Sequence, residues 1–307
     1  AVAAEREKFR TALAEVKPQL GRHYPLVIGG REVRTTKTLP SLNPSRTSQT
    51  IGTTSAAGNA EAEQAVAAAQ GALAEWNARG VEARTEIIRR AAEIMRERRF
   101  ELAAWITLES GKPWREADGD VAEAIDFCEY YARQALRFER PAGFDLPGED
   151  NEFTYVPRGV TAVIAPWNFP LAILCGMTVA ALVTGNTVVI KAAEPSLTIG
   201  RKFFELLEQV GFPRGVASFV ATHHAEPTFG TVGDVETPPT PRDAILRLGD
   251  RSRETVGILP RHVEEIERDA LRRLRADSGE SAELVDEALD GTFVRRCQAK
   301  LSRAGRR

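Results

Sequence analysis

One apolar segment, residues 159–194, constrains the fold more than any other part of this 307-residue chain. Its ends, Val160–Ala165 and Thr187–Ile190, are short, β-branched and apolar without alternation, as is typical of strands buried on both faces. Between them a helix is predicted from about Pro170 to Gly185, because proline suits a first helical turn and glycine commonly ends a helix. A strand, a helix and a strand in this order predict two parallel strands joined by a right-handed crossover.

Polar residues follow both predicted strands. Pro166-Trp167-Asn168-Phe169 comes after the first strand, and Lys191-Ala192-Ala193-Glu194 comes after the second. In parallel α/β sheets ligands bind beyond the carboxyl ends of the strands. The sequence therefore predicts a ligand site where these two segments meet.

The same segments carry a family resemblance. The motifs PWNFP (166–170) and GNTVVIK…E (185–194) resemble those of the aldehyde dehydrogenase superfamily in order and spacing. Three further phrases narrow the resemblance to the L-glutamate γ-semialdehyde (1-pyrroline-5-carboxylate) dehydrogenases: EAIDFCEYYARQALR (123–137), PGEDNEFTYVPRG (147–159) and GFPRGV (211–216). We find this resemblance over about residues 5–220.

The resemblance implies an α/β fold with a Rossmann-like parallel sheet of the aldehyde dehydrogenase type, truncated before the catalytic domain. It implies a cofactor-binding domain made of residues 1–143 and 156–220, with the start of a bridging, oligomerisation hairpin at 144–155. Residues 221–307 form an unrecognised tail, in which we expect a Pro/Thr-rich loop and two short amphipathic helices, one with an apolar stripe over 263–274.

Other elements are expected from pattern alone. Helices are predicted over 5–22, 59–77 with Asn59 as N-cap, 82–110, 114–138 and 196–210. A β-hairpin with Gly29-Gly30 at its turn is predicted over 23–33, and short strands over 49–53, 152–156 and 216–220. Residues 41–48 are predicted to form a loop.

By resemblance, Asn168 is the oxyanion-hole residue, whose NH₂ group donates to the tetrahedral adduct. Donors of this kind contribute about 3–4 kcal/mol in the transition state. The alternative is that Asn168 caps a helix N-terminus. Lys191 and Glu194 resemble the pair that holds the adenosine ribose, and the alternative for them is a solvated charged turn.

The resemblance also implies that the backbone of Ile164, Ala165, Pro166 and Trp167 lines the cofactor cleft. Phe169 and Glu123 match positions close to the substrate. Each could instead be structural, Phe169 in the core and Glu123 on a solvated helix face.

The catalytic half of the family's site has no counterpart in the sequence. Neither the GQxC context of the nucleophile, nor the E-[LMT]-GG-K context of the base, nor FTGS occurs. Cys297 falls at about the family's distance from Asn168 without the surrounding motif, and Cys128 and Cys175 are interpreted as buried thiols. His223, His224 and His262 lack metal-like partners, so no metal site is predicted.

Two functional hypotheses follow. The first is NAD-dependent oxidation of L-glutamate γ-semialdehyde to L-glutamate in proline degradation, with turnover by this chain left open. The second is a non-catalytic nucleotide- or partner-binding fragment with an interaction tail. A net charge of −2 gives no reason to expect nucleic acid or a membrane, and we expect a cytoplasmic protein, with homo-oligomers implied by the family.

Overall fold

The computed structural model describes residues 2–139, 148 and 154–223, all within the first of two compact units, Ala1–Pro239. The second unit, Thr240–Arg307, lies outside the described residues. The predicted amphipathic helices, Cys297, His224 and His262 therefore lie outside them too, as does most of the expected hairpin at 144–155.

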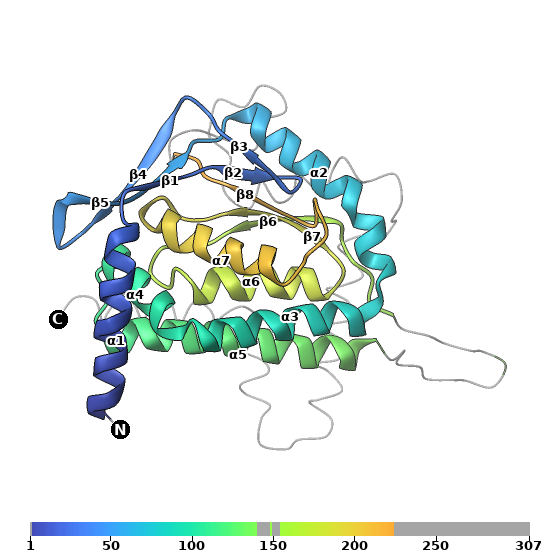
Figure 1. The fold of residues 1–307 in the computed structure, drawn as a ribbon. Helices are drawn as coiled ribbons and strands as arrows, with labels where there is room; N and C mark the ends of the chain where they lie inside the picture. The colour runs from blue at the N-terminus through green and yellow to red at the C-terminus, as the bar shows by residue number, and fades with distance from the viewer. Residues whose placement is uncertain (1, 140–147, 149–153, 224–307) are drawn as a thin grey trace, which may run out of the picture. The chain divides into compact units, whose positions relative to one another are not determined.

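The central sheet has five strands in the order β3-β2-β8-β7-β6 (Figure 1). β6 (Val160–Ile164), β7 (Thr187–Lys191) and β8 (Ala217–Val220) are parallel neighbours, which confirms the predicted parallel α/β sheet. β2 (Leu26–Ile28) and β3 (Arg31–Val33) extend the sheet antiparallel, and together they form the predicted hairpin around Gly29-Gly30.

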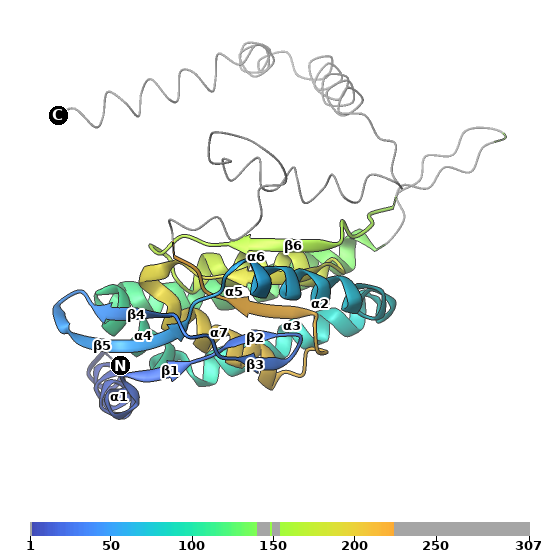
Figure 2. The ribbon, with the colours of Figure 1, turned by 90° about the horizontal axis from the view of Figure 1, so that it is seen from above.

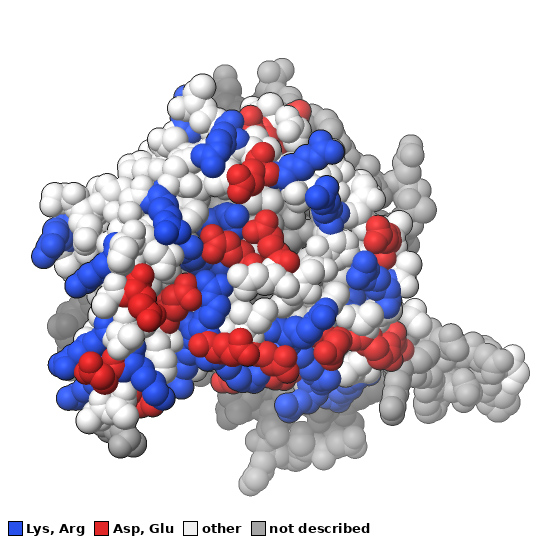
Figure 3. Space-filling model, in the orientation of Figure 1, with Lys and Arg blue, Asp and Glu red and all other residues white. Residues whose placement is uncertain are grey.

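Helices cover both faces of this sheet. α2 (Asn59–Ala78) lies on one face, whereas α6 (Ala172–Val183) and α7 (Leu197–Gln209) lie on the other (Figures 1 and 2). α3 (Gly80–Glu97) and α5 (Trp114–Phe138) pack beyond α6 as a further layer. On the face shown in Figure 3, acidic and basic side chains alternate over these helices and form no patch of one sign.

A smaller sheet, in the order β1-β5-β4, stands beside the helices α1 (Val2–Val16) and α4 (Arg99–Ser110). Its strands are β1 (Arg22–Tyr24), β4 (Thr38–Asn43) and β5 (Arg46–Ser55). The prediction of a loop over 41–48 was wrong, because β4 and β5 form a hairpin there. Polar Ser41 and Asn43 occupy inward positions of β4, so the sequence does not show the usual alternation of apolar and polar residues.

Other elements also differ from expectation. The helix predicted over 5–22 is α1, which ends at Val16 and is followed by a 3₁₀ turn, Lys17–Gln19. The helix predicted over 82–110 is two helices, because the chain leaves the helical path at Arg98 without any Gly or Pro to signal it. Gly58 is the N-cap of α2, and Asn59 is its first residue. No strand forms over Thr154–Val156, and the rest of the strand predicted over 152–156 lies outside the described residues.

The carboxyl end of α6 is held by side chains from α2 and α3. Trp76 Nε1 donates to Leu182 O at 3.0 Å. Arg84 Nε donates to Val183 O at 3.0 Å, and its NH1 group donates to Asn77 O at the same distance. The buried Arg84 thus binds one carbonyl group at the end of α6 and one in the last turn of α2, where helix ends leave carbonyl groups unpaired.

We therefore predict that Arg84→Met lowers the free energy of unfolding by about 2–4 kcal/mol, since it removes two bonds from a charged donor to buried carbonyls. Urea denaturation of the purified chain measures this change. Arg133→Met, at an exposed position of α5, is the matched control and should have little effect. Equal stability of the two variants would contradict a structural role for Arg84.

Candidate functional site

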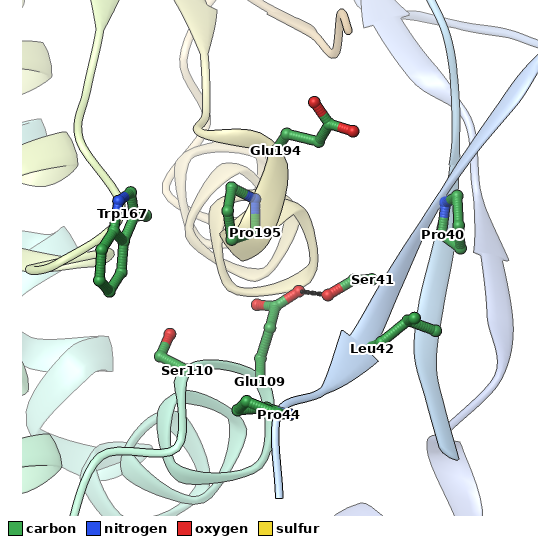
Figure 4. A pocket seen from close by; sticks show the side chains of 9 residues that line it. All are labelled: Pro40, Ser41, Leu42, Pro44, Glu109, Ser110, Trp167, Glu194 and Pro195. Carbon is green, nitrogen blue, oxygen red and sulfur yellow. Dashed lines mark hydrogen bonds between the residues drawn. The ribbon is translucent and has the colours of Figure 1, made fainter. Parts of the chain in front are cut away.

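A pocket of about 350 Å³ opens at the carboxyl ends of β6 and β7 (Figure 4). Two of the predicted site residues line it, Trp167 from the segment after β6 and Glu194 from the segment after β7. Its other lining residues come from β4 and the turn after it, from the end of α4 and from the position after Glu194: Pro40, Ser41, Leu42, Pro44, Glu109, Ser110 and Pro195.

The register of the parallel strands brings the two segments together. Ile164, the last residue of β6, pairs with Lys191, the last residue of β7. Both strands therefore stop at the same level, and the chain turns outward from neighbouring points. Ala165 is buried, whereas Pro166 and Trp167 are exposed, and Trp167 lines the pocket.

Lys191 is only 6% exposed. Burial lowers the pKa of its ammonium group, whereas the nearby Glu194 carboxylate raises this pKa by a smaller amount. Glu194 itself is half-buried and lies 3.5 Å from His223 Nε2. A ligand that accepts a hydrogen bond from this ammonium group would compensate part of the cost of burying the charge.

Glu109 forms the floor of the pocket and was not predicted from the sequence. Its carboxylate accepts the backbone N–H groups of Thr198 and Ile199, each at 2.7 Å, and the hydroxyl of Ser41 at 2.5 Å. It thereby binds the positive N-terminal end of α7. Burial raises its pKa, against the effect of these hydrogen bonds.

A sequence signal for Glu109 does exist. An acidic residue in the last turn of a helix is electrostatically unfavourable, and Glu109 stands directly before the end of α4. Such a residue is expected to bind a different helix or strand, as Glu109 binds the N-terminal N–H groups of α7. Next to it, the buried hydroxyl of Ser110 has no hydrogen-bond partner among the described residues and lines the pocket.

The start of α6 is fixed by a buried ion pair. Asp120 on α5 accepts the backbone N–H of Ala172 at 2.7 Å and the ammonium of Lys112 at 2.7 Å. The same ammonium lies 4.0 Å from the centre of the Phe169 ring. The segment that carries Asn168 is thus attached to α5 directly before the helix begins.

Asn168 is exposed, and its side chain makes no hydrogen bond to the described residues. α6 begins at Ala172 with Leu171 as N-cap, so the capping role considered for Asn168 is not what this structure shows. Its NH₂ group is available to an external acceptor.

Phe169 and Glu123 do not line the pocket. Phe169 is exposed beside Lys112 and is therefore not a core residue. Glu123 is exposed on α5, one helical turn after Asp120, so it lies on the helix that holds the start of α6. The structure thus brings Trp167 and Glu194 into one pocket, with Lys191 at the adjoining strand end. The other predicted site residues do not line this pocket: Ile164, Ala165, Pro166, Asn168, Phe169 and Glu123.

Cys128 and Cys175 are both buried, with their sulfur atoms 3.6 Å apart between α5 and α6. Burial raises the pKa of Cys175, which lowers its reactivity as a nucleophile. Among the described residues, no group of three or more His, Cys, Asp and Glu side chains is arranged to hold a metal ion. No helix in the part of the chain that the structure describes is long and apolar enough to cross a membrane.

Known proteins resemble this chain in sequence and in fold. Residues 32–231 match the aldehyde dehydrogenase family, so the match extends beyond residue 220. A 1-pyrroline-5-carboxylate dehydrogenase of Geobacillus thermodenitrificans is 46% identical over 261 residues, covering 82% of this chain and 50% of that protein. A second such enzyme, from Bacillus subtilis, is 46% identical over 237 residues, covering 76% of this chain and 45% of its own length.

Solved structures show the same relationship. The 1-pyrroline-5-carboxylate dehydrogenase from Thermus with bound NAD is 49% identical, with a TM-score of 0.70 over 72% of this chain and 43% of that one. Proline utilization A from Bdellovibrio bacteriovorus is 46% identical, with a TM-score of 0.72 over 73% of this chain and 24% of that one. The chain spans about half the length of the curated relatives it matches. On its motifs, its fold and these matches, the chain belongs to the aldehyde dehydrogenase family.

Proposed function

We propose that this chain forms the NAD-binding part of an aldehyde dehydrogenase that oxidises L-glutamate γ-semialdehyde to L-glutamate in proline degradation. The observation that carries this proposal is the pocket at the ends of β6 and β7, where Trp167 and Glu194 meet beside the buried Lys191. The substrate class follows from relatives named 1-pyrroline-5-carboxylate dehydrogenase at 43–47% identity. The cofactor follows from the Thermus relative with bound NAD.

The residues present fit a nicotinamide dinucleotide. A carboxylate and an ammonium at one strand end suit the two hydroxyl groups of a ribose, and the unpartnered hydroxyl of Ser110 offers a further polar contact. Trp167 offers an exposed ring, and we assign the backbone from Ile164 to Trp167 to the wall of the cofactor cleft. When bound here, a nicotinamide dinucleotide would supply the hydride acceptor for oxidation of the aldehyde.

The remaining roles are assigned to residues at the start of α6. Asn168 donates from its NH₂ group to the oxygen of the aldehyde as negative charge develops there. Phe169 packs against the aliphatic part of the substrate, and Glu123 lies near its reacting end. Asp120 and Lys112 hold this segment in place through the contacts at Ala172 and Phe169.

The nucleophilic thiolate and the general base belong to the part of the relatives that this sequence does not match. We therefore propose that the chain binds the cofactor but does not turn over the aldehyde alone. We assign residues 1–143 and 156–220 to the cofactor-binding domain, and residues 144–155 to the segment that joins subunits of a homo-oligomer. We place the protein in the cytoplasm, as expected for a degradative dehydrogenase with this composition.

The alternative is a nucleotide-binding fragment with no part in catalysis. Both candidate functions place a nucleotide in the same pocket, but a nucleotide-binding fragment would have no aldehyde substrate. Addition of L-glutamate γ-semialdehyde separates them, because a dehydrogenase part should bind the aldehyde beside Asn168, whereas a nucleotide-binding fragment should not.

Calorimetric titration of the purified chain should show that it binds NAD⁺ more tightly than NADP⁺, because the Glu194 carboxylate disfavours a phosphate on the ribose. Glu194→Gln should weaken NAD⁺ binding about 10-fold or more, since one charge-assisted hydrogen bond contributes about 1.5–3 kcal/mol. Glu63→Gln, at an exposed position of α2, is the control. Unchanged affinity in Glu194→Gln would remove Glu194 from the cofactor site.

The buried ammonium group of Lys191 should lower the stability of the free chain and strengthen its binding of NAD⁺. Because burial lowers its pKa, the folded chain loses this proton before the unfolded chain does as the pH rises. The free energy of unfolding should therefore rise with pH between that lowered pKa and the ordinary value of 10.5. Lys191→Met should remove this rise, increase stability at pH 7 and weaken NAD⁺ binding.

Urea denaturation across this pH range and calorimetry measure the two effects of Lys191→Met. Lys202→Met is the control, because Lys202 is equally buried but paired with Glu205 at 3.1 Å. Lys202→Met should lower the free energy of unfolding, because it leaves Glu205 without this partner. Loss of stability at pH 7 in Lys191→Met would show that the ammonium is already satisfied without a ligand.

A further inference from the structure

Two cysteines face each other across the contact between α5 and α6. Cys128 belongs to α5 and Cys175 to α6, and both side chains are fully buried. Their sulfur atoms lie 3.6 Å apart, so the two thiols are in direct contact. Neither cysteine lines the pocket at the strand ends, and the proposed reaction uses neither of them.

The two helices approach each other closely at this point. Gly176, the residue after Cys175, faces the Phe127 ring, and a Cβ atom added to this glycine would lie 2.9 Å from that ring. The thiol of Cys175 donates to the backbone carbonyl of Ala124, one turn before Cys128, at 3.5 Å. A sulfur atom of α6 thus already reaches the main chain of α5. The two sulfur atoms need to approach by only about 1.5 Å to reach the length of a disulfide bond.

We propose that Cys128 and Cys175 form a modification site, at which a peroxide oxidises the two thiols to a disulfide that links α5 to α6. One thiolate attacks the O–O bond of hydrogen peroxide, which gives a sulfenic acid and, with one proton, the first water molecule. The second sulfur atom then displaces the hydroxyl group, which leaves as the second water molecule while the S–S bond forms. Two thiols lose two electrons and two protons, and one hydrogen peroxide is reduced to two water molecules.

Burial sets the rate of this reaction in both directions. The thiolate is the form that attacks the peroxide, and the apolar contact between the helices disfavours it, so the disulfide forms when α5 and α6 separate locally. The same burial shields the finished disulfide from thiol reductants, because an attacking thiolate must reach one of its sulfur atoms. The link therefore forms slowly and persists in the folded chain.

The disulfide would fix the first part of α6 on α5. The backbone N–H of Ala172 is already bound to Asp120 on α5 at 2.7 Å, and Cys175 lies one turn farther along α6. Oxidation thus adds a second link to the helix that follows Asn168. It also joins residues 47 positions apart, which restricts the unfolded chain and stabilises the folded one.

The test treats the purified 307-residue chain with hydrogen peroxide and examines it by peptide mapping, by thiol counting after unfolding and by thermal denaturation. We expect peptides joined through Cys128 and Cys175, two of the three thiols lost, and a thermal midpoint raised by about 5 °C or more. Cys128→Ala and Cys175→Ala should each abolish the link and the rise, measured against the untreated sample of the same variant. Cys297→Ala is the matched control and should keep both.

The two methionines of the chain show where the peroxide has reached. Met177 is 41% exposed and should become methionine sulfoxide. Met95 is fully buried and should stay unmodified as long as the chain is folded. A link that forms while Met95 is intact therefore arises in the folded chain.

Four results would overturn the proposal. Cys128 and Cys175 could both stay free while Met177 is fully oxidised, or either of them could pair with Cys297 instead. One of them could be converted to a sulfinic acid without a link. The link could also appear only together with oxidation of Met95, which would place its formation in the unfolded chain.

The oxidised chain also separates this proposal from the proposed function. No residue assigned to the cofactor takes part in the link, so the linked chain should bind NAD⁺ with the affinity of the reduced chain. Absence of NAD⁺ binding in both forms would contradict the cofactor site and leave the disulfide in place. Loss of NAD⁺ binding only in the linked form would contradict our account that the link leaves the pocket unchanged.

Discussion

The parallel pairing of β6, β7 and β8 is the constraint on which the site depends. Ile164 pairs with Lys191, and Lys191 pairs with Val220, so three strands end at one level. A shift of one residue in either pairing would turn every side chain of a strand to the opposite face of the sheet. In the central strand β7 all five residues are buried and four of them are β-branched, so a shift would disturb packing on both faces of the sheet.

The site places polar groups where the core would otherwise be apolar, and other parts of the fold support them. Glu109 binds the first N–H groups of α7, and Asp120 binds the start of α6. Each of these buried acids is itself satisfied by several donors, as a buried carboxylate requires. Two helix N-termini are thereby fixed on either side of the segments that follow β6 and β7.

The sequence was sufficient for the elements with strong apolar patterns. The β6–α6–β7 unit, α5 and the hairpin at Gly29-Gly30 form close to the predicted residues, because burial and turn chemistry act locally there. The β4–β5 hairpin was missed because its inward positions hold the polar residues Ser41 and Asn43. Asn43 bonds Gln49 within the hairpin, whereas Ser41 bonds Glu109 on α4, and a partner so far away in sequence leaves no local pattern.

The candidate site also contains residues that local sequence predicts and residues that only contacts between distant elements bring together. Trp167 and Glu194 were predicted from their positions at strand ends and from the family motifs, and the structure places both at the pocket. Glu109, Ser110 and the Lys112–Asp120 pair were not predicted, because their contacts join α4, α5, α6 and α7 in three dimensions. Asp120 did leave a trace, as an acid within the apolar side of α5.

We propose that the cofactor binds at the strand ends of β6 and β7. Hydrogen exchange of the backbone amides, followed by mass spectrometry with and without saturating NAD⁺, is the measurement that tests this assignment. Binding there should slow exchange in residues 165–169 and 191–196 and leave α1 unchanged. Unchanged exchange in both segments, or slower exchange only elsewhere in the chain, would contradict it.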